Sequence, residues 1–296
     1  MPLPYLILLL ANVVYATSYV VTRVTLLSVA PATLALFRLV IGSLILVPLA
    51  LLRGGPEAVP VSGRDRWSIL WMGVFGFAGA FAFAHWGIAR STATNAALLI
   101  TVEPISLVLL SPVLLGERLT ARETIGAVMA LGGAVLVVVN GIPGVTRALA
   151  PHWRGDLLLI ISGLAYASYS LFGRGVLIRH AALPVTAWSI LAGAAAMIPL
   201  ALYEWAEGSR PVWTAASLAG TLYLAVVITA LGYLAWNYGL ERVEAPRAAV
   251  FLNVQPLVGA LLGVWLLGEP LTVFTVAGGA LIIGGLHLTV DAARIR

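Results

Sequence analysis

Long apolar segments, separated by short polar connections, run through the whole chain. A helix needs about 20 predominantly apolar residues to cross the hydrocarbon core of a bilayer. Ten segments meet that length: 4–22, 31–52, 67–89, 93–115, 121–140, 155–173, 184–203, 213–238, 246–267 and 271–290. No convincing cleavage site follows the first segment, so we expect a retained membrane helix rather than a removed signal peptide. The pattern predicts an all-α integral membrane protein with ten transmembrane helices.

The second half of the chain repeats the first. Residues 85–139 align with 237–291 without a gap, and about 20 of the 55 aligned positions are identical. Glu103-Pro104 returns as Gln255-Pro256. The early helices repeat more weakly, so that the duplication covers nearly the whole chain. Internal duplication of this kind is typical of transporters, which bind substrate where the repeats meet.

The placement of arginines predicts how the two halves insert. Between the spans, arginines are about twice as frequent on the side of the N-terminus as on the opposite side. The positive-inside rule therefore predicts that both termini are cytoplasmic. Each half has five helices, an odd number, so the second half must insert upside down relative to the first. We expect two inverted five-helix repeats related by a pseudo-two-fold axis in the membrane plane.

The longest polar connection divides the chain into three parts. We expect a first repeat at 1–140, an inter-repeat loop at 141–154 and a second repeat at 155–296. Thr120 and Glu123 form a predicted capping box at the start of the fifth helix. Thr272, at the equivalent point of the second repeat, is expected to cap the tenth helix without a carboxylate partner.

Paired motifs in the two halves carry a family resemblance. The first copy runs from Glu103-Pro104 through Leu-Leu-Gly-Glu-Arg-Leu-Thr to Gly132-Gly133. The second runs from Gln255-Pro256 through Leu-Gly-Glu-Pro-Leu-Thr to Gly284-Gly285, and Phe37-Arg38 also fits. The chain thus resembles the drug/metabolite transporter superfamily, specifically its ten-helix branch of two EamA-type repeats. The resemblance spans essentially all ten helices and implies a secondary transporter in the bacterial inner membrane. Among members, the chain is most similar to bacterial exporters of aromatic and other neutral amino acids, although the family also exports drugs and other metabolites.

A carboxylate deep in the fourth span is the leading candidate for the transport site. Glu103 lies about ten residues, or about 15 Å, inside that span, near the midplane of the membrane. Gln255 occupies the equivalent place in the ninth span, and Pro104 and Pro256 are expected to kink the two helices. Paired proline-interrupted segments at corresponding positions are a pointer to a transporter's binding site. Two interpretations of Glu103 stay open: a protonated side chain that only fixes helix packing, or a group that binds a substrate ammonium or carries a proton.

Rings and amides supply the rest of the candidate site. We expect a central cavity between the halves, lined by spans 1, 3, 4, 6, 8 and 9. Its predicted wall consists of Tyr15, Tyr19, Phe77, Phe81, His85, Glu103, Tyr166, Tyr169, Tyr233, Trp236, Asn237, Asn253 and Gln255. A cavity lined by rings and a few amides suits neutral amino acids with apolar side chains.

Two further polar residues allow more than one interpretation. Arg38 lies about 10 Å deep in the second span, where it either snorkels outward or pairs with a carboxylate. His85 either reaches an aqueous vestibule or makes a structural hydrogen bond. We expect Glu269, in the Leu-Gly-Glu motif, to stabilise a turn at a helix end.

Composition excludes several kinds of chemistry. The chain is 61% hydrophobic and 10% charged, whereas about a quarter of the residues in a soluble domain are charged. It has no cysteine, which excludes disulfides and cysteine-ligated metals, and no lysine, which excludes a Walker A loop and a Schiff base. We expect no cofactor and no metal. The net charge of +5 reflects arginines at the membrane interfaces rather than a nucleic-acid surface.

Three alternatives to an amino-acid exporter remain. An intramembrane enzyme is not expected, because the aspartates lie at helix ends or in loops and no His-Glu-x-x-His or Gly-x-Ser-x-Gly motif is present. A carrier of phosphorylated substrates needs two or more cationic groups at the midplane, and Arg38 is the one available. An exporter of lipophilic cations stays open, since Glu103 and a ring-lined cavity suit a cation equally well. The oligomeric state does not follow from the sequence.

Overall fold

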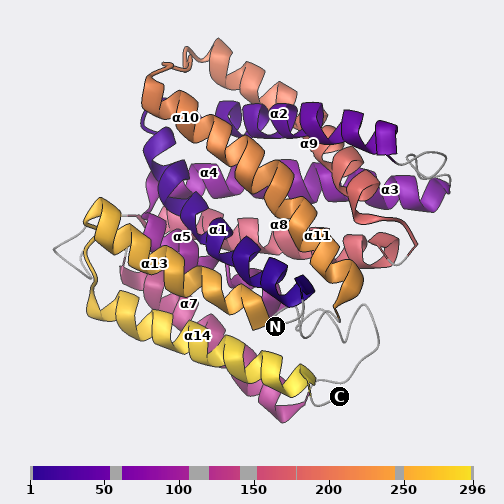
Figure 1. Cartoon of the computed structure of the whole chain (residues 1–296). Helices are drawn as coiled ribbons and strands as arrows, with labels where there is room; N and C mark the ends of the chain where they lie inside the picture. Colours follow the sequence, from indigo (N-terminus) through magenta and orange to yellow (C-terminus); the bar gives the residue numbers. More distant parts are fainter. Residues whose placement is uncertain are drawn as a thin grey trace.

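Helices follow one another through the described part of the chain (Figure 1). The computed structural model describes residues 3–53, 62–106, 120–140, 152–177, 179–243 and 250–294. The first half contains α1 (Leu3–Thr25), α2 (Pro31–Arg53), α3 (Gly63–Trp71), η2 (Met72–Gly79), α4 (Ala80–Arg90), α5 (Ala93–Leu99) and α7 (Ala121–Asn140). The second half contains α8 (Trp153–Leu177), α9 (Ala182–Ala206), α10 (Ala215–Tyr223), η3 (Leu224–Gly232), α11 (Tyr233–Arg242), η4 (Val250–Asn253), α13 (Val254–Leu267) and α14 (Val273–Arg294).

These elements correspond to the predicted spans, and the protein is a ten-helix membrane protein. Seven described helices are long and apolar enough to cross a bilayer, and two shorter apolar helices match the ninth and tenth spans. The fourth span is described as α5 and a further helical stretch at 102–106, and its remainder lies outside the described residues. The predicted inter-repeat loop at 141–154 also lies outside them, except for 152–154.

The packing of the helices reflects the duplication. Helices at equivalent positions of the two halves pack against each other: α2 with α9, α5 with α13, and α7 with α14. Other contacts also come in matched pairs; for example, α8 packs against α4 as α1 packs against α11. In Figure 1, α7 and α14 lie side by side at the lower edge of the bundle, and α2 and α9 lie toward the upper edge. This arrangement is the one expected of two inverted repeats.

The third and eighth spans are each interrupted by a π-helical segment that the sequence did not predict. η2 and η3 begin 152 residues apart, at Met72 and Leu224, which are equivalent positions of the two repeats. A π-helix widens the turn and shifts the register of the residues that follow, and such segments are frequent at functional sites. Each π-segment here directly precedes a helix, α4 or α11, that contributes side chains to the central cavity.

Glycines allow the closest helix contacts. A Cβ atom on Gly133 of α7 would lie 2.5 Å from the carbonyl oxygen of Gly278 on α14, and one on Gly278 would lie 2.7 Å from that of Gly133. In η2, a Cβ atom on Gly73 would meet the backbone of Ser189 on α9 at 2.5 Å. Small residues at helix interfaces let backbones approach each other where lipid supplies no hydrophobic driving force.

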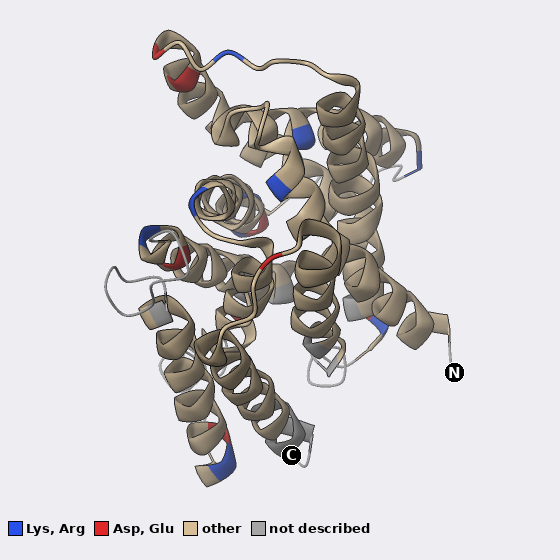
Figure 2. Cartoon of the chain, turned by 90° about the vertical axis from the view of Figure 1, so that its left-hand side faces the viewer, with Lys and Arg blue, Asp and Glu red and all other residues tan. Residues whose placement is uncertain are grey.

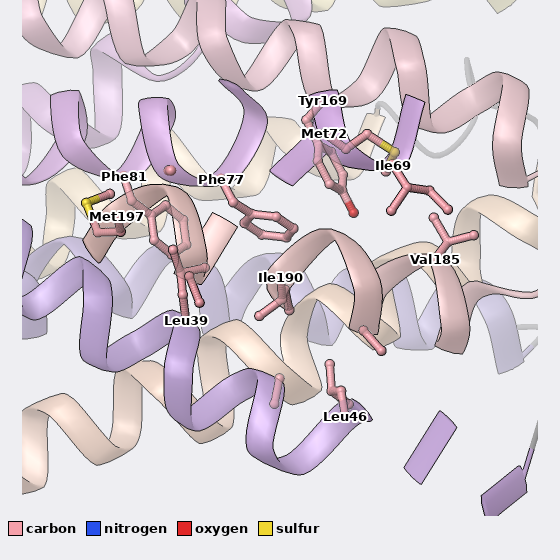
Figure 3. Close-up of a cluster of buried hydrophobic side chains, with 14 of the residues drawn as sticks. Leu39, Leu46, Ile69, Met72, Phe77, Phe81, Tyr169, Val185, Ile190 and Met197 are labelled. Carbon is pink, nitrogen blue, oxygen red and sulfur yellow. The ribbon is translucent and has the colours of Figure 1, made fainter. Parts of the chain in front are cut away.

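A buried cluster of large side chains joins α2, η2, α4, α8 and α9 (Figure 3). Phe77 and Phe81 lie at its centre, with exposed fractions of 0% and 1%. The charged residues are sparse in the bundle, and most of them lie toward helix ends (Figure 2). The predicted capping box is confirmed at the start of α7, where Thr120 and Glu123 bond reciprocally, and Thr272 caps α14 through the N–H of Thr275.

Candidate functional site

A cavity of about 90 Å³ lies in the middle of the bundle, between the two halves. That volume has room for a few water molecules. The wall comes from α1, α2, α4, α8, η3, α11, η4 and α13, together with α5 and the residues after it. Nine of the predicted site residues line it: Tyr15, Tyr19, His85, Glu103, Tyr166, Tyr169, Tyr233, Trp236 and Gln255.

Glu103 reaches the cavity from a break in the fourth span. The cap residue Thr92 opens α5 by accepting a hydrogen bond from the N–H of Asn95 at 3.0 Å, and the helix ends at Leu99. The N–H of Glu103 bonds the carbonyl of Ile100 at 2.9 Å, so that this carbonyl has a partner although Pro104 cannot donate to it. Among the described residues, the carboxylate of Glu103 accepts one side-chain hydrogen bond, from Ser170 on α8 at 3.0 Å. Glu103 lines the cavity, and a carboxylate can accept more hydrogen bonds than this one.

Gln255, the equivalent residue of the second repeat, is more fully engaged. Its Oε1 accepts a hydrogen bond from the hydroxyl of Tyr19 at 2.9 Å, and its Nε2 donates to Oδ1 of Asn12 at 2.7 Å. The amide of Asn12 in turn donates to the carbonyl of Leu8 at 2.8 Å. This chain of bonds ties α13 to α1. The two equivalent residues therefore differ in their contacts: Glu103 has acceptor capacity left, whereas Gln255 links two helices.

Tyrosine rings form much of the cavity wall. Tyr233 is at their centre, with ring centroids 5.5 Å from Tyr15, 6.0 Å from Tyr169 and 4.8 Å from Phe77. The hydroxyl of Tyr15 is buried and has no hydrogen-bond partner within the described part of the chain. Phe77 does not line the cavity but packs behind Tyr169 and Tyr233.

Three other predicted wall residues lie elsewhere or are not described. Phe81 is buried beneath Arg38 and His85, and Asn237 lies behind the wall, where it donates to the hydroxyls of Tyr169 at 2.9 Å and Thr186 at 2.6 Å. The side chain of Asn253 lies outside the described residues. The break in each helix falls before its proline: Pro104 is the third residue of the stretch at 102–106, and Pro256 is the third residue of α13. Both prolines therefore stand in a first turn, where a missing N–H is tolerated.

Both predictions for Arg38 are wrong. Its side chain is 5% exposed, so it does not snorkel, and none of the ion pairs among the described residues includes it. Instead, its Nε donates to the hydroxyl of Thr229 at 3.2 Å and its Nη1 donates to Nε2 of His85 at 2.9 Å. Arg38 lines the cavity together with His85.

Sequence reasoning also missed three small polar wall residues: Ser18, Thr22 and Ser170. A signal was present, because Ser18 and Thr22 follow Tyr15 by three and seven residues and so share its helix face. Ser170 carries no such sign beyond its place next to Tyr169. Its role as the partner of Glu103 depends on a contact between α8 and the fourth span.

Carboxylates at helix ends hold other helices in place. Gly268, at φ +64°, ends α13, and Glu269 then points to the start of α5. It accepts hydrogen bonds from the N–H groups of Ala93 and Thr94, both at 2.8 Å, and from the hydroxyl of Thr94 at 2.6 Å. Glu269 thus caps a helix of the other repeat rather than stabilising a turn of its own helix. Glu204 binds the start of α2 in the same way.

An ion cluster lies between the first turn of α3 and the connection from α8 to α9. Asp65 in the first turn of α3 accepts from the guanidinium of Arg179 and pairs with His180 at 3.0 Å. Arg179 and His180 lie in the connection between α8 and α9. The hydrogen bond to Asp65 raises the pKa of Arg179, so that this residue is charged at every physiological pH. The cluster joins the two halves of the chain.

Known proteins resemble this chain over nearly its whole length. The model of the EamA-like transporter family matches residues 2–139 and 153–290. A probable terminal-alkyne amino-acid exporter of Streptantibioticus cattleyicolor is 30% identical over 281 residues, covering 95% of this chain and 91% of the relative. An uncharacterized transporter of Archaeoglobus fulgidus is 28% identical over 286 residues, which is 96% of both chains.

A solved crystal structure shares the fold. It superposes with a TM-score of 0.69 and 24% identity over 98% of both chains.

The matched segments of the family model cover both halves, and the relatives are named as transporters rather than enzymes. The chain belongs to the EamA-like transporter family and is a multi-pass membrane transporter.

Proposed function

We propose that this transporter exports neutral amino acids, aromatic ones foremost, across the bacterial inner membrane by alternating access. The observation that carries the proposal is the wall of the central cavity, which tyrosine rings share with a carboxylate, Glu103, that accepts a single side-chain hydrogen bond from the described residues. Rings offer apolar surface and stacking to an aromatic side chain, and a carboxylate attracts an ammonium group. The relative named as an amino-acid exporter supports this choice.

Alternating access follows from the arrangement of the repeats. The cavity lies between halves that touch through pairs of equivalent helices, so that rocking about the pseudo-two-fold axis would open one side while closing the other. We place the first repeat at 1–140 and the second at 155–296, with both termini in the cytoplasm. The start of α1 and the end of α14 lie toward the same side of the bundle in Figure 1, as expected if both termini face the same compartment.

An exporter of lipophilic cations is the second candidate. It is favoured by the same carboxylate and by the face of rings around Tyr233, because a cation is attracted to an aromatic face. The two candidates differ in one respect: a lipophilic cation has no use for a cationic group in the cavity wall, whereas Arg38 is there.

The decisive experiment is uptake into proteoliposomes. Labelled tryptophan, phenylalanine and leucine are compared with labelled tetraphenylphosphonium, with and without an imposed proton gradient. Saturable uptake of the amino acids is expected, together with little uptake of the phosphonium ion. Preference for the phosphonium ion would replace the first candidate by the second.

Glu103→Gln tests the site within the same assay. The substitution keeps the size of the side chain but removes its charge, so amino-acid uptake should fall at least about tenfold, which corresponds to about 1.4 kcal/mol. The matched control is Glu241→Gln, which removes an exposed carboxylate paired with Arg242 at 2.9 Å, outside the cavity. Normal uptake by a folded Glu103→Gln protein at every pH would exclude Glu103 as the substrate or proton site.

A further inference from the structure

We propose that Arg38 binds the carboxylate of a zwitterionic substrate while Glu103, in the same cavity, receives its ammonium group. The inference rests on the proposed function and makes it more specific: the substrate must carry both charges. Two charged poles in one cavity, one from α2 and one from the stretch after α5, would select an α-amino acid over an amine or an acid of the same shape.

The positive charge of Arg38 has no counter-charge among the residues that the structure describes. The side chain is 5% exposed, and no carboxylate of the described residues lies within 4.0 Å of it. A buried charge is costly unless it is paired, and charges at membrane depth mark substrate pathways. The described contacts of the guanidinium use two of its five N–H donors, which leaves a bidentate face for a carboxylate.

Two neutral groups, the imidazole of His85 and the hydroxyl of Thr229, accept the hydrogen bonds of Arg38. A guanidinium can only donate, so Nε2 of His85 is the acceptor and carries no proton. The other ring nitrogen, Nδ1, then carries the proton and donates it to the carbonyl of Pro31 at 3.0 Å. The imidazole is therefore neutral, and it fixes the guanidinium without compensating its charge.

Thr229 behaves in the same way on the other side. Its hydroxyl donates to the carbonyl of Leu224 at 2.8 Å within η3, which leaves an oxygen lone pair to accept from Nε of Arg38. Beneath the guanidinium lies the ring of Phe81, 4.1 Å from its central carbon. Arg38 is thus held by α4 and η3 in one orientation, and its charge is kept available. These are the properties of a preorganised anion site.

A second donor lies on the same wall. The hydroxyl of Tyr15 is buried without a partner in the described part of the chain, and Tyr15 lines the cavity with Arg38. Gly232 makes room for the ring, because a Cβ atom there would lie 2.8 Å from its Cε1. A buried donor without a partner is unfavourable until something accepts its proton, and a substrate carboxylate would do so.

The test is competition against labelled tryptophan in proteoliposomes of the wild-type protein. Three competitors have the same ring: tryptophan, tryptophan amide, which lacks the carboxylate, and indole-3-propionate, which lacks the ammonium group. We expect both analogues to compete at least about tenfold less well than tryptophan. The ratio of the competitor concentrations is measured on the wild-type protein, so it tests the inference even if variants at Arg38 fail to fold.

Arg38→Gln then assigns the carboxylate to its partner. The variant should raise the KM for tryptophan at least tenfold and abolish the preference for tryptophan over its amide, while Arg38→Lys should restore part of that preference. A purely structural role for Arg38 would lower transport of every substrate and leave the preference unchanged. The matched control is Arg23→Gln, since Arg23 bonds the carbonyls of Ile88 and Ala89 and does not line the cavity.

The outcomes separate the inference from the proposed function. Uptake of tryptophan with equal competition by its amide, or an Arg38→Gln variant with the wild-type preference, would overturn the inference and leave the amino-acid exporter standing. Failure of the folded wild-type protein to take up any amino acid would overturn both.

Discussion

Glu269 supports the start of α5, the helix that leads to Glu103, and removing its charge should weaken that support measurably. Glu269→Gln keeps the size of the side chain but leaves one acceptor oxygen instead of two. If the amide oxygen takes the place of Oε2, it keeps both bonds to Thr94, and the amide nitrogen then faces the N–H of Ala93. The amide N–H of the introduced glutamine and the backbone N–H of Ala93 are both donors, so the hydrogen bond between positions 93 and 269 is lost.

The size of the effect follows from those bonds. The residue Ala93 is 0% exposed, and a buried N–H left without a partner costs about 1–3 kcal/mol. Loss of a negative charge at a helix N-terminus adds about 0.3–1 kcal/mol. Glu269 itself is half-buried, so water offsets part of the first contribution. We expect a loss of stability on the order of 2 kcal/mol, within the range of these two contributions.

Thermal unfolding in detergent, followed by the fluorescence of the nine tryptophans, measures this loss. A change of 2 kcal/mol corresponds to a fall in Tm of roughly 4–8 °C for a domain of comparable size. Glu241→Gln, which removes a carboxylate from an exposed ion pair, should leave Tm nearly unchanged, because such pairs contribute about 0–1 kcal/mol. Equal Tm values for the two variants would refute the cap as a source of stability.

Two further predictions concern packing. Gly133→Leu should lower the free energy of unfolding by about 1–3 kcal/mol, because its Cβ atom would lie 2.5 Å from the carbonyl oxygen of Gly278. The control is Gly132→Leu, which should unfold at the wild-type temperature because a Cβ atom there would meet no atom within 4 Å. Asn237→Leu should cost about 1–3 kcal/mol by leaving the buried hydroxyl of Tyr169 without its donor, and the double variant with Tyr169→Phe should recover part of that loss. Thermal unfolding of these four variants, compared with the wild-type protein, tests both predictions. Equal changes in Tm for Gly133→Leu and Gly132→Leu would contradict the prediction on helix packing.

The spans and the duplication were predictable because both are local properties of the sequence. A run of about 20 apolar residues has one structural solution in a bilayer. The π-segments were not predictable, since η2 and η3 are uninterrupted apolar stretches of a span and their sequences carry no sign of a widened turn. The pairs Gly132-Gly133 and Gly284-Gly285 were visible in the sequence, but the structure alone shows which glycine of each pair packs closely. Gly133 and Gly285 face the partner helix, whereas a Cβ atom on Gly132 would meet no atom within 4 Å and one on Gly284 would lie 3.7 Å from the end of the Met129 side chain.

The candidate site was predictable in its residue types but not in its contacts. Deep tyrosines and a deep carboxylate were recognisable from depth alone. Phe77 and Asn237 share that depth, yet they lie behind the wall. The rotation of a helix about its axis decides whether a side chain faces the cavity or the packed interior, and depth does not reveal that rotation. Arg38 was misjudged because its partner Thr229 lies 191 positions away, and a neutral acceptor leaves no mark in a charge pattern.

The charges of the cavity divide unequally between the repeats, and this asymmetry bears on how a substrate is held. Of the described wall residues, Arg38 and Glu103 are the ones with a full charge, and both belong to the first repeat. In the second repeat their equivalents are Ser189, buried and bonded to the carbonyls of Val185 and Thr186, and Gln255, bonded to α1. A cavity with equal charges in both halves would hold a zwitterion in two opposite orientations. Charges in one half alone allow a single orientation, so the two poles of the substrate would stay with the first repeat while the second moves around them.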